Sequence, residues 1–295
     1  MASILEPSPT DYDIEFFWDP VCPFAWITSR WIEKVAAQSQ LTVDWRFISL
    51  RLLNKDKDYA SEFPPEYERG HTAGLRMLRV AAAIRDKLGR DPLGRLVAAY
   101  GESYWDQPQD SPVRTRLSTT EHVVEVLESA GLPTRFAEAL DDNSWDPLLD
   151  EETELALSRT GRDVGTPIIT FNSHAGSGNS HAGSGRLRGI SFFGPVISRV
   201  PTDEEALPLW DAVTTLASFP GFAEMKRSLR EVPQLSILGF DIDGSEINEP
   251  GEGEGHESGQ GQGSGQESDQ GPIEEDWVGG HRRGHLKADT ADKAD

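Results

Sequence analysis

The chain has 295 residues and is acidic, with 50 Asp and Glu against 28 Lys and Arg and a formal net charge of -22. This balance argues against nucleic acid as a partner, because phosphate binding needs clustered basic side chains. No apolar run approaches the roughly 18–20 residues of a membrane span, and the first residues lack the charged-then-apolar pattern of a secretory signal. We therefore expect a cytoplasmic protein without membrane contact. Cys22 is the only cysteine, which excludes an internal disulfide and any metal cluster built on several thiolates.

Residues 241–295 differ in composition from the rest of the chain. They are mostly Gly, Glu, Gln, Ser and Asp, and they hold 15 acidic and 4 basic residues, a net charge of -11. Their few apolar side chains cannot bury enough surface to offset the entropy of ordering the backbone. We expect a disordered acidic tail that aids solubility.

The folded part opens with a strand, a helix and a second strand. Ile14–Trp18 is rich in aromatic residues and bounded by Asp and Pro, which is typical of a short buried strand. Apolar residues then recur every three to four positions from Pro23 to about Gln38, which predicts a helix with proline in its first turn. Residues 41–50 alternate apolar and polar side chains, which predicts a half-buried strand.

From residue 55 to 160 the pattern becomes helical, and we expect a separate all-helical insertion here. Ser118 and Glu121 have the spacing of a capping box at a helix start, and Gly161 suits a helix end. The expected helices are 72–88, 93–104, 118–130, 133–140 and 148–160.

Two strands and two helices complete the expected fold. The strands are predicted at Ile168–Phe171 and Ile190–Phe193, and the helices at 202–216, which starts with a Thr-x-x-Glu capping box, and at 222–230. The strands are joined by a connection in which NSHAGSG occurs twice, over residues 172–185. A lengthened loop explains this repeat, since its two histidines lack a Cys or carboxylate that would anchor a metal.

Cys22 stands immediately before the first predicted helix. The helix dipole and the free backbone N–H groups at such a place stabilise a thiolate over a thiol, so we expect the pKa of this thiol to lie below that of a free cysteine. A thiolate is the nucleophile that attacks disulfides and electrophiles. Lone cysteines in general are more often buried and inert, but the strand, Cys-Pro, helix context favours a functional residue.

A second proline motif, Val164-Gly165-Thr166-Pro167, lies directly ahead of the third predicted strand. Proline as the first residue of a strand removes no ladder donor, and a Thr-Pro bond at this place can be cis. Alone the motif is weak, since X-Pro at a strand start is ordinary. Together with the Cys-Pro helix start it indicates a redox site.

Four segments carry a resemblance to a known family: Phe16-Phe17-Trp18-Asp19-Pro20-Val21-Cys22-Pro23-Phe24-Ala25-Trp26-Ile27-Thr28-Ser29-Arg30-Trp31, Ser49-Leu50 with Leu53-Asn54, Gly165-Thr166-Pro167, and Phe192-Phe193-Gly194-Pro195-Val196. They resemble the thioredoxin superfamily, whose redox site sets a Cys-x-x-Cys helix start against a cis-proline loop. The chain looks most like the DsbA-like proteins with a helical insertion and, within them, the mycothiol-dependent nitroreductases of actinobacteria. The resemblance covers about residues 12–230, and the repeat and the tail fall outside it.

The expected fold is therefore α/β. A thioredoxin-like domain comprises residues 12–54 and 161–240 and is interrupted by the helical insertion 55–160, and the tail 241–295 follows.

The resemblance implies a thiol-dependent oxidoreductase whose cleft lies between the thioredoxin-like domain and the insertion. It implies that Cys22 is catalytic, that mycothiol or a similar small thiol is the co-substrate, and that no cofactor is tightly bound. Nitroaromatic or other electrophilic compounds, or mixed disulfides, are the implied substrates, and a homodimer is left open. The residues implied to bind thiol and substrate are Pro23, Phe24, Trp26, Asn54, Thr166, Pro167, Phe193 and Gly194.

The resemblance also gives these residues roles by position. Phe24 and Trp26 would flank the thiolate, and Asn54 would offer a polar contact at the cleft. The Thr166 backbone would pair with the incoming thiol compound, with Phe193 near its groove. Trp26 and Phe193 suit the protein core equally well, and Asn54 also suits a cap on the insertion.

Ala25 departs from the two-cysteine pattern, because it stands where the resolving cysteine would be. An internal disulfide is therefore excluded. We expect a mixed disulfide on Cys22 to be resolved by an external small thiol, which favours monothiol or transferase-like chemistry over dithiol oxidation.

Two other functions remain open. One is the thiol-dependent isomerase or transferase chemistry of the kappa-class glutathione-transferase-like branch, in which the bound thiol compound reacts and the protein only activates it. The other is a thioredoxin-fold binding module that has lost catalysis. Neither remaining histidine of interest enters the mechanism: His71 is expected to be solvated just before a helix, and His122 to be a structural residue within one.

Overall fold

The computed structural model describes residues 12–172, 189–227 and 231–240. The predictions for the NSHAGSG repeat beyond Asn172 and for the acidic tail lie outside these residues. The strands are β1 (Ile14–Trp18), β2 (Val43–Phe47), β3 (Ile168–Phe171) and β4 (Ile190–Phe193). The helices are α1 (Pro23–Ser39), α2 (Leu50–Leu53), α3 (Tyr59–Glu62), α4 (Pro65–Leu88), α5 (Leu93–Tyr104), α6 (Val113–Arg116), α7 (Thr120–Ser129), α8 (Asp146–Thr160) and α9 (Asp203–Ser218), with 3-10 helices η1 (Thr134–Asp141), η2 (Asn143–Trp145) and η3 (Ser236–Leu238).

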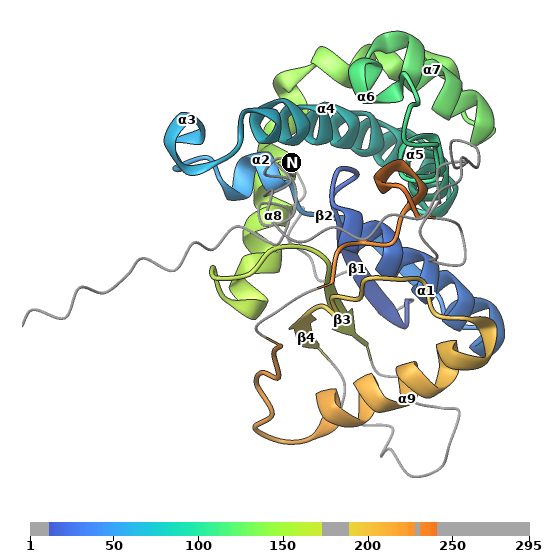
Figure 1. The fold of residues 1–295 in the computed structure, drawn as a ribbon, viewed down its shortest axis with the longest axis vertical. Helices are drawn as coiled ribbons and strands as arrows, with labels where there is room; N and C mark the ends of the chain where they lie inside the picture. Colours follow the sequence, from blue (N-terminus) through green and yellow to red (C-terminus); the bar gives the residue numbers. More distant parts are fainter. Residues whose placement is uncertain (1–11, 173–188, 228–230, 241–295) are drawn as a thin grey trace, which may run out of the picture.

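The strands of the described residues form one sheet in the order β2-β1-β3-β4 (Figure 1). β1 is parallel to β2, and β3 is antiparallel to both of its neighbours. The connection from β1 through α1 to β2, followed later by the β3-β4 hairpin and α9, is the arrangement of a thioredoxin-like fold. This confirms the predicted fold class with its inserted helices, while the proposed domain boundaries at residues 54 and 160 stay a prediction.

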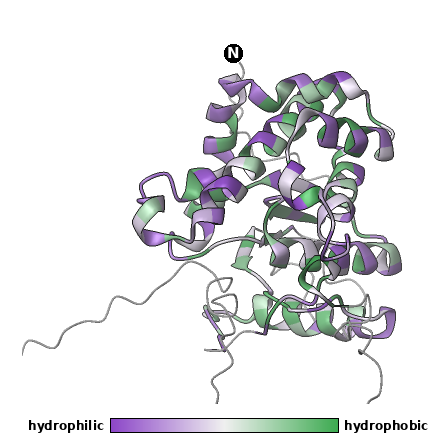
Figure 2. Cartoon of the chain, turned by 45° about the horizontal axis from the view of Figure 1, so that its top comes forward, coloured by the Kyte–Doolittle hydropathy of each residue, from purple (hydrophilic) through white to green (hydrophobic). Residues whose placement is uncertain are grey.

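Helices cover both faces of the sheet. α1 and α9 pack together, and the ring centres of Trp31 and Trp210 lie 5.8 Å apart between them. α8 contacts β2 and β4 from the other side. The helices α3 to α7 gather beyond one end of the sheet (Figure 1), and each carries both hydrophobic and hydrophilic residues (Figure 2), as helices with one buried side do.

The two sides of β1 pack into different clusters, since alternate side chains of a strand point to opposite faces of the sheet. Ile14, Phe16 and Trp18 belong to the main hydrophobic core. Phe17 packs instead with residues of α8 in a smaller cluster. Every residue of β1 is buried, which confirms the predicted buried strand.

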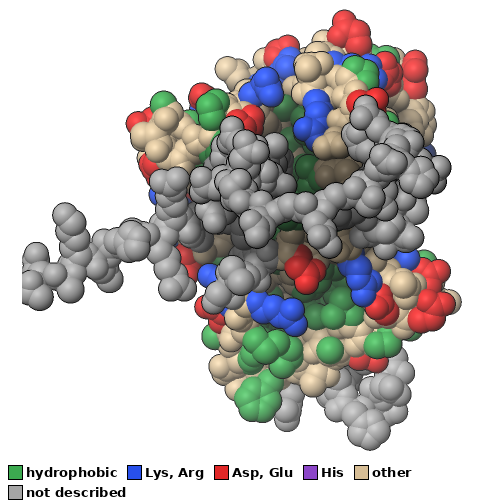
Figure 3. Space-filling model, in the orientation of Figure 1, with side chains coloured by type: hydrophobic (Ala, Val, Ile, Leu, Met, Phe, Trp, Pro, Cys, Tyr) green, Lys and Arg blue, Asp and Glu red, His purple; other side chains and the backbone are tan. Residues whose placement is uncertain are grey.

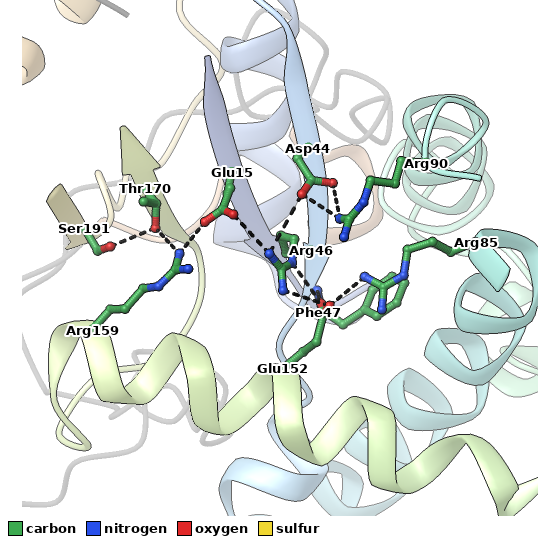
Figure 4. Close-up of polar contacts among 10 residues, drawn as sticks. All are labelled: Glu15, Asp44, Arg46, Phe47, Arg85, Arg90, Glu152, Arg159, Thr170 and Ser191. Atoms are coloured by element: carbon green, nitrogen blue, oxygen red, sulfur yellow. Dashed lines mark hydrogen bonds and ion pairs between the residues drawn. The ribbon is translucent and has the colours of Figure 1, made fainter. Parts of the chain in front are cut away.

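The prediction that β2 is half-buried is wrong, because its polar side is buried too. Asp44 has no exposed surface, and Arg46 is 5% exposed. Arg46 donates to Glu15 of β1 at 3.0 Å and to Glu152 of α8 at 2.9 Å, and Arg90 donates to Asp44 at 2.6 Å (Figure 4). The alternating pattern indicated a solvent-facing side, but pairing of these charges allows α8 to cover it.

Glu152 connects this buried network to the insertion. Besides Arg46, it accepts from Arg85 of α4 at 2.7 Å and from the Phe47 N–H at 2.9 Å. Burial alone would raise the pKa of Glu152, but the charges of Arg85 and Arg46 outweigh burial and lower it. The carboxylate thus holds α4, α8 and β2 together.

In its described residues, 222–227, the segment after α9 does not form the helix predicted at 222–230. Residues 222–227 have no regular structure, and all of them except Phe222 are exposed. They lack the buried apolar face that stabilises so short a helix. The preceding helix is confirmed, with the predicted capping box between Thr202 and Glu205.

Two helix predictions in the insertion need correction. Thr119 rather than Ser118 caps α7, because the Thr119 hydroxyl accepts the N–H of His122. The pattern at 133–140 forms a 3-10 helix instead of an α-helix. The predicted end of α8 at Gly161 is confirmed.

We expect Glu152→Ala to lower the free energy of unfolding by about 3–5 kcal/mol, because Arg46 and Arg85 would keep buried charges without their partner. Glu151→Ala, on the exposed side of the same helix, is the control and should change stability by less than about 0.5 kcal/mol. Urea unfolding followed by circular dichroism measures both. Equal losses in the two variants would contradict a role for the paired charges.

Candidate active site

The chain turns from β1 into α1 at Cys22, which is the N-cap residue of that helix. Its sulfur accepts the N–H of Ala25 at 3.4 Å. Pro23 occupies the start of the helix, where a missing N–H costs no hydrogen bond. The local structure therefore places Cys22 as predicted, at a position where the helix dipole favours a thiolate.

The loop ahead of β3 lies against this sulfur. Cys22 Sγ donates to the Thr166 carbonyl at 3.4 Å, and the Thr166–Pro167 bond is cis, as predicted. Thr166 Oγ1 donates to the Phe17 carbonyl at 3.2 Å, which ties the loop to β1. Within the described part of the chain the Thr166 N–H has no acceptor. One backbone donor therefore stands unused beside the sulfur.

Cys22 forms part of the wall of a cavity of about 1950 Å³. The residue is 6% exposed, so reagents reach the sulfur through this cavity. α2 and, from the insertion, α4 supply one wall, and β4 and α9 supply the other. Hydrophobic side chains gather in the lower part of the face in Figure 3, around α9 and the segment after it. Pockets for one small ligand usually have volumes of about 300–1,000 Å³, so this cavity is larger than one small ligand needs.

Most of the predicted site residues lie around this cavity, and Pro167, which follows Thr166, is buried. The predicted residues that line the cavity are Cys22, Pro23, Phe24, Asn54, Thr166, Phe193 and Gly194.

Asn54 combines the two roles that the sequence left open. It ends α2, and its side-chain amide donates to the Leu50 carbonyl at 2.8 Å, so it is a helix cap. It also lines the cavity. No donor among the described residues meets its amide oxygen, which leaves this oxygen available as an acceptor.

Phe193 and Gly194 join β4 to the loop before β3. The Phe193 ring lies 3.9 Å from the position that a Cβ on Gly165 would take. Gly194 has a φ of +98°, which favours glycine, and its N–H donates to the Pro167 carbonyl at 2.9 Å. These contacts set an aromatic ring beside the cis-proline loop.

Trp26 does not line this cavity, which favours the core position over the place beside the thiolate, both of which the sequence left open. It is 5% exposed and packs in a separate cluster with Trp105 and Ile237. Its indole N–H donates to Asp106 at 3.0 Å, and its ring lies directly against the backbone of α5 at Gly101. Trp26 therefore fixes α1 to the insertion.

His71 is also placed differently from the prediction. It lies within α4, is 8% exposed and lines the same cavity as Cys22. Its Nδ1 is 2.9 Å from the Tyr59 hydroxyl, and burial, assisted by the charge of Arg51, lowers the pKa of His71 to about 4. The sequence signal that was missed is the Pro-Pro-Glu start at Pro65, which begins the helix before His71.

His122 is a structural residue, as predicted. It is 1% exposed, and its Nε2 lies 3.0 Å from the Ser103 hydroxyl. Its Nδ1 accepts the Ser118 N–H at 3.3 Å. Both ring nitrogens are thus used within the insertion, and burial lowers the pKa of His122 to about 4.

Asp19 was not predicted to have a role of its own. Its side chain accepts the N–H groups of Val21 at 3.0 Å and Leu50 at 2.7 Å, and its carbonyl accepts the Cys22 N–H at 3.1 Å. Burial raises the pKa of Asp19 to about 7, although both N–H groups act against it. Asp19 thus joins the Cys22 loop to the start of α2.

The chemistry of the site is that of one thiol. Ala25 is buried and brings only its N–H to the sulfur. In the ranges that the structure covers, no three His, Cys, Asp or Glu side chains come together as a metal site requires. Likewise no helix of those ranges has the length and apolar character to cross a membrane.

The fold and the site together define a thioredoxin-fold thiol oxidoreductase, with one cysteine at a helix start facing a cis-proline loop. A family model described as Rv2466c-like, mycothiol-dependent nitroreductase Rv2466c, matches residues 21–227, and the chain belongs to this family. This confirms the resemblance found in the sequence. The chain is an enzyme of thiol-disulfide oxidoreductase character, and its family implies a small-molecule thiol as partner.

Two further proteins are similar to this chain. Uncharacterized protein Rv2286c of Mycobacterium tuberculosis (strain ATCC 25618 / H37Rv) is 30% identical over 217 residues, which are 72% of this chain and 81% of that protein. A solved structure of 2-hydroxychromene-2-carboxylate isomerase is similar over 69% of this chain and 95% of its own, with 14% identity and a TM-score of 0.42.

Gly101→Ala should lower the free energy of unfolding by about 1–3 kcal/mol, because its Cβ would overlap the Trp26 ring and overpack the contact between α1 and α5. Gly70→Ala in α4 is the matched control, since a Cβ there meets no atom within 4 Å. This control should be neutral or stabilising by up to about 1 kcal/mol. Thermal and urea unfolding decide, and a stable Gly101→Ala variant would contradict the packing.

The stability contributed by Asp19 should depend on pH. Its folded-state pKa of about 7 lies above its ordinary value of 3.8, so the folded chain holds an extra proton between these values. This stabilisation is complete below about pH 4 and is lost as the pH rises through 7. Asp19→Asn should remove that slope.

Urea unfolding at pH steps from 4 to 8 measures the slope for wild type, Asp19→Asn and the exposed control Asp110→Asn. The difference in the free energy of unfolding between wild type and Asp19→Asn should change with pH up to about pH 7 and become constant above it. Parallel curves for these two proteins would show that Asp19 does not titrate there.

Proposed function

We propose that the chain reduces nitroaromatic or other electrophilic compounds, or mixed disulfides, with mycothiol as reductant and Cys22 as its single redox sulfur. The observation that carries this proposal is the place of Cys22 Sγ at the start of α1, 3.4 Å from the Thr166 carbonyl, in the wall of a large cavity. Membership of a mycothiol-dependent family supports the choice of co-substrate.

A mixed disulfide between mycothiol and a substrate thiol needs one enzyme sulfur. The Cys22 thiolate attacks the mycothiol sulfur, a new S–S bond forms as the old one breaks, and the substrate leaves as a thiolate. A second mycothiol thiolate then attacks the mycothiol sulfur of the adduct. Mycothiol disulfide leaves, and the Cys22 thiolate is restored.

A nitro compound takes two electrons from two thiols. Cys22 and one mycothiol supply them and become joined in a mixed disulfide, and the nitro group accepts the electrons with two protons and loses one oxygen as water. The product is a nitroso compound. A second mycothiol then releases Cys22 as before, so both reactions share the same adduct.

The cavity residues take roles that agree with their local bonds. The unused Thr166 N–H, beside Pro167, pairs with the incoming thiol compound, and the free amide oxygen of Asn54 accepts a hydrogen bond from a ligand. Phe24 and Phe193 offer aromatic surface in the wall of the same cavity. Gly194, which follows Phe193, keeps the backbone close to the cis-proline loop.

We also propose a cytoplasmic location, because a reducing compartment keeps small thiols available for turnover. A homodimer remains open, and the acidic balance of the chain favours no nucleic-acid partner.

The adduct is the direct test. Full-length wild type treated with mycothiol disulfide should gain the mass of one mycothiol less two hydrogens at Cys22 and lose it on addition of reduced mycothiol. Cys22→Ser should gain no mass. Ala25→Cys should release the adduct without added thiol and become 2 Da lighter than its reduced form, because the new thiol occupies the resolving position of a Cys-x-x-Cys site.

Steady-state reduction of a nitroaromatic compound with mycothiol completes the test. Wild type should turn over, and Cys22→Ser should lose activity by at least about a thousandfold, since no sulfur carries the electrons. Retained turnover in Cys22→Ser would favour the isomerase or transferase chemistry, in which the protein only activates a bound thiol. An unreactive Cys22 in wild type would favour a binding module.

A further inference from the structure

His71 is a buried side chain in the cavity wall that the proposed mechanism does not use. It lies in the first half of α4, the long helix of the insertion. Its position relative to Cys22 follows from the glycine one turn further along. A Cβ on Gly74 would lie 2.5 Å from Asp19 Oδ1 and 2.9 Å from Val21 Cγ2. α4 therefore packs directly on the loop that precedes Cys22.

Three residues of an α-helix advance about 4.5 Å and return to nearly the same side. His71 thus projects from the side of α4 that meets the Cys22 loop, one turn before the contact at Gly74. His71 and Cys22 line the same cavity, so a molecule that extends from the sulfur towards α4 meets the imidazole.

The protonation of the imidazole follows from its partner Tyr59. The Tyr59 hydroxyl is 2.9 Å from His71 Nδ1, and Tyr59 is 7% exposed. No other acceptor among the described residues meets this hydroxyl. A buried O–H without an acceptor is costly, so we assign the hydroxyl as the donor and Nδ1 as the acceptor.

The hydrogen of the neutral ring then lies on Nε2. Burial and the charge of Arg51, which lies 4.5 Å above the Tyr59 ring, oppose the imidazolium form and lower the pKa of His71. Within the described ranges Nε2 meets no protein partner. Two side-chain nitrogens of the described residues are fully enclosed without a partner, Trp18 Nε1 and Arg116 Nε, and His71 Nε2 is not one of them. The Nε2–H group therefore opens into the cavity.

Aromatic rings surround this donor. The Tyr67 ring centre lies 5.4 Å from that of His71, and the Phe63 ring centre lies 6.1 Å from it. Both rings line the same cavity. A neutral donor framed by aromatic surface suits a flat ligand that carries an uncharged acceptor oxygen, and it also stabilises negative charge that develops on this oxygen during reduction.

We propose that His71 Nε2–H binds the acceptor oxygen of a planar aromatic electrophile, such as a nitro or quinone oxygen, in the cavity beside Cys22, with Tyr59 fixing the tautomer. This rests on the proposed function, since it names the substrate group that the same cavity selects. His71 is thereby a specificity-determining residue, and Tyr59 is a positioning residue that acts through it.

The test compares two probes of similar shape, 4-nitrobenzyl alcohol and 4-isopropylbenzyl alcohol. The nitro group of the first carries two acceptor oxygens, and the isopropyl group of the second carries none. Binding is measured by calorimetry on the full-length chain with Cys22→Ser, so that no reaction follows. This parent should prefer the nitro probe. Adding His71→Phe should weaken nitro binding about two- to tenfold, the value of one hydrogen bond, and leave isopropyl binding unchanged.

Two conservative variants separate hydrogen bonding from ring packing. His71→Gln keeps a side-chain N–H donor and should retain the preference for the nitro probe. Tyr59→Phe removes the hydroxyl that fixes the His71 tautomer without changing the cavity wall, and this variant should lose part of the preference for the nitro probe. Tyr12→Phe, a phenol outside the cavity that contacts Asp91, is the control and should match the parent.

The assignment is overturned if His71→Phe keeps the preference, if it weakens both probes equally, or if His71→Gln behaves like His71→Phe. Should His71→Phe fail to fold, an unchanged preference in Tyr59→Phe overturns it instead. The redox proposal fails separately. Formation of the mycothiol adduct on wild-type Cys22 does not involve His71, so a missing adduct removes that proposal while the probe preference still decides this one.

Discussion

The sulfur of Cys22 is held between two backbone groups that lie far apart in the sequence, the Ala25 N–H and the Thr166 carbonyl. The pairing of β1 with β3 brings these two groups together. β1 and β3 are antiparallel, with Phe17 opposite Ile168, so the loop that leaves β1 and the loop that enters β3 share one edge. The central place of β1 in the sheet therefore assembles the redox site from two loops.

The insertion is part of this site. It follows α2, whose first N–H is bound by the side chain of Asp19. It ends with α8, whose Glu152 binds Arg46 of β2. Between these points α4 packs on the Cys22 loop at Gly74 and turns His71 into the cavity. Buried charges and one close backbone approach thus fix the cavity wall relative to the sulfur.

Local sequence signals predicted the parts of the site whose geometry is local. Cys22 before Pro23, and Thr166 before Pro167, each restrict the backbone where they stand, and both lie as predicted. Local signals could not place Trp26, because its ring fits only where Gly101 of another helix has no side chain. The polar side of β2 was misjudged for a related reason: alternation reports side-chain chemistry, and only the tertiary structure shows that α8 covers those charges.

Ala25 has a consequence for the order of events in the proposed cycle. An enzyme with two active-site cysteines forms an internal disulfide when it is oxidised and can then release its co-substrate from the cavity. In this proposed cycle the oxidised form carries its co-substrate, because the chain has no second cysteine to replace it. The oxidised fraction of the enzyme in this cycle therefore follows the ratio of reduced to oxidised mycothiol in the surroundings. A new electrophile reacts only after the bound mycothiol has left Cys22.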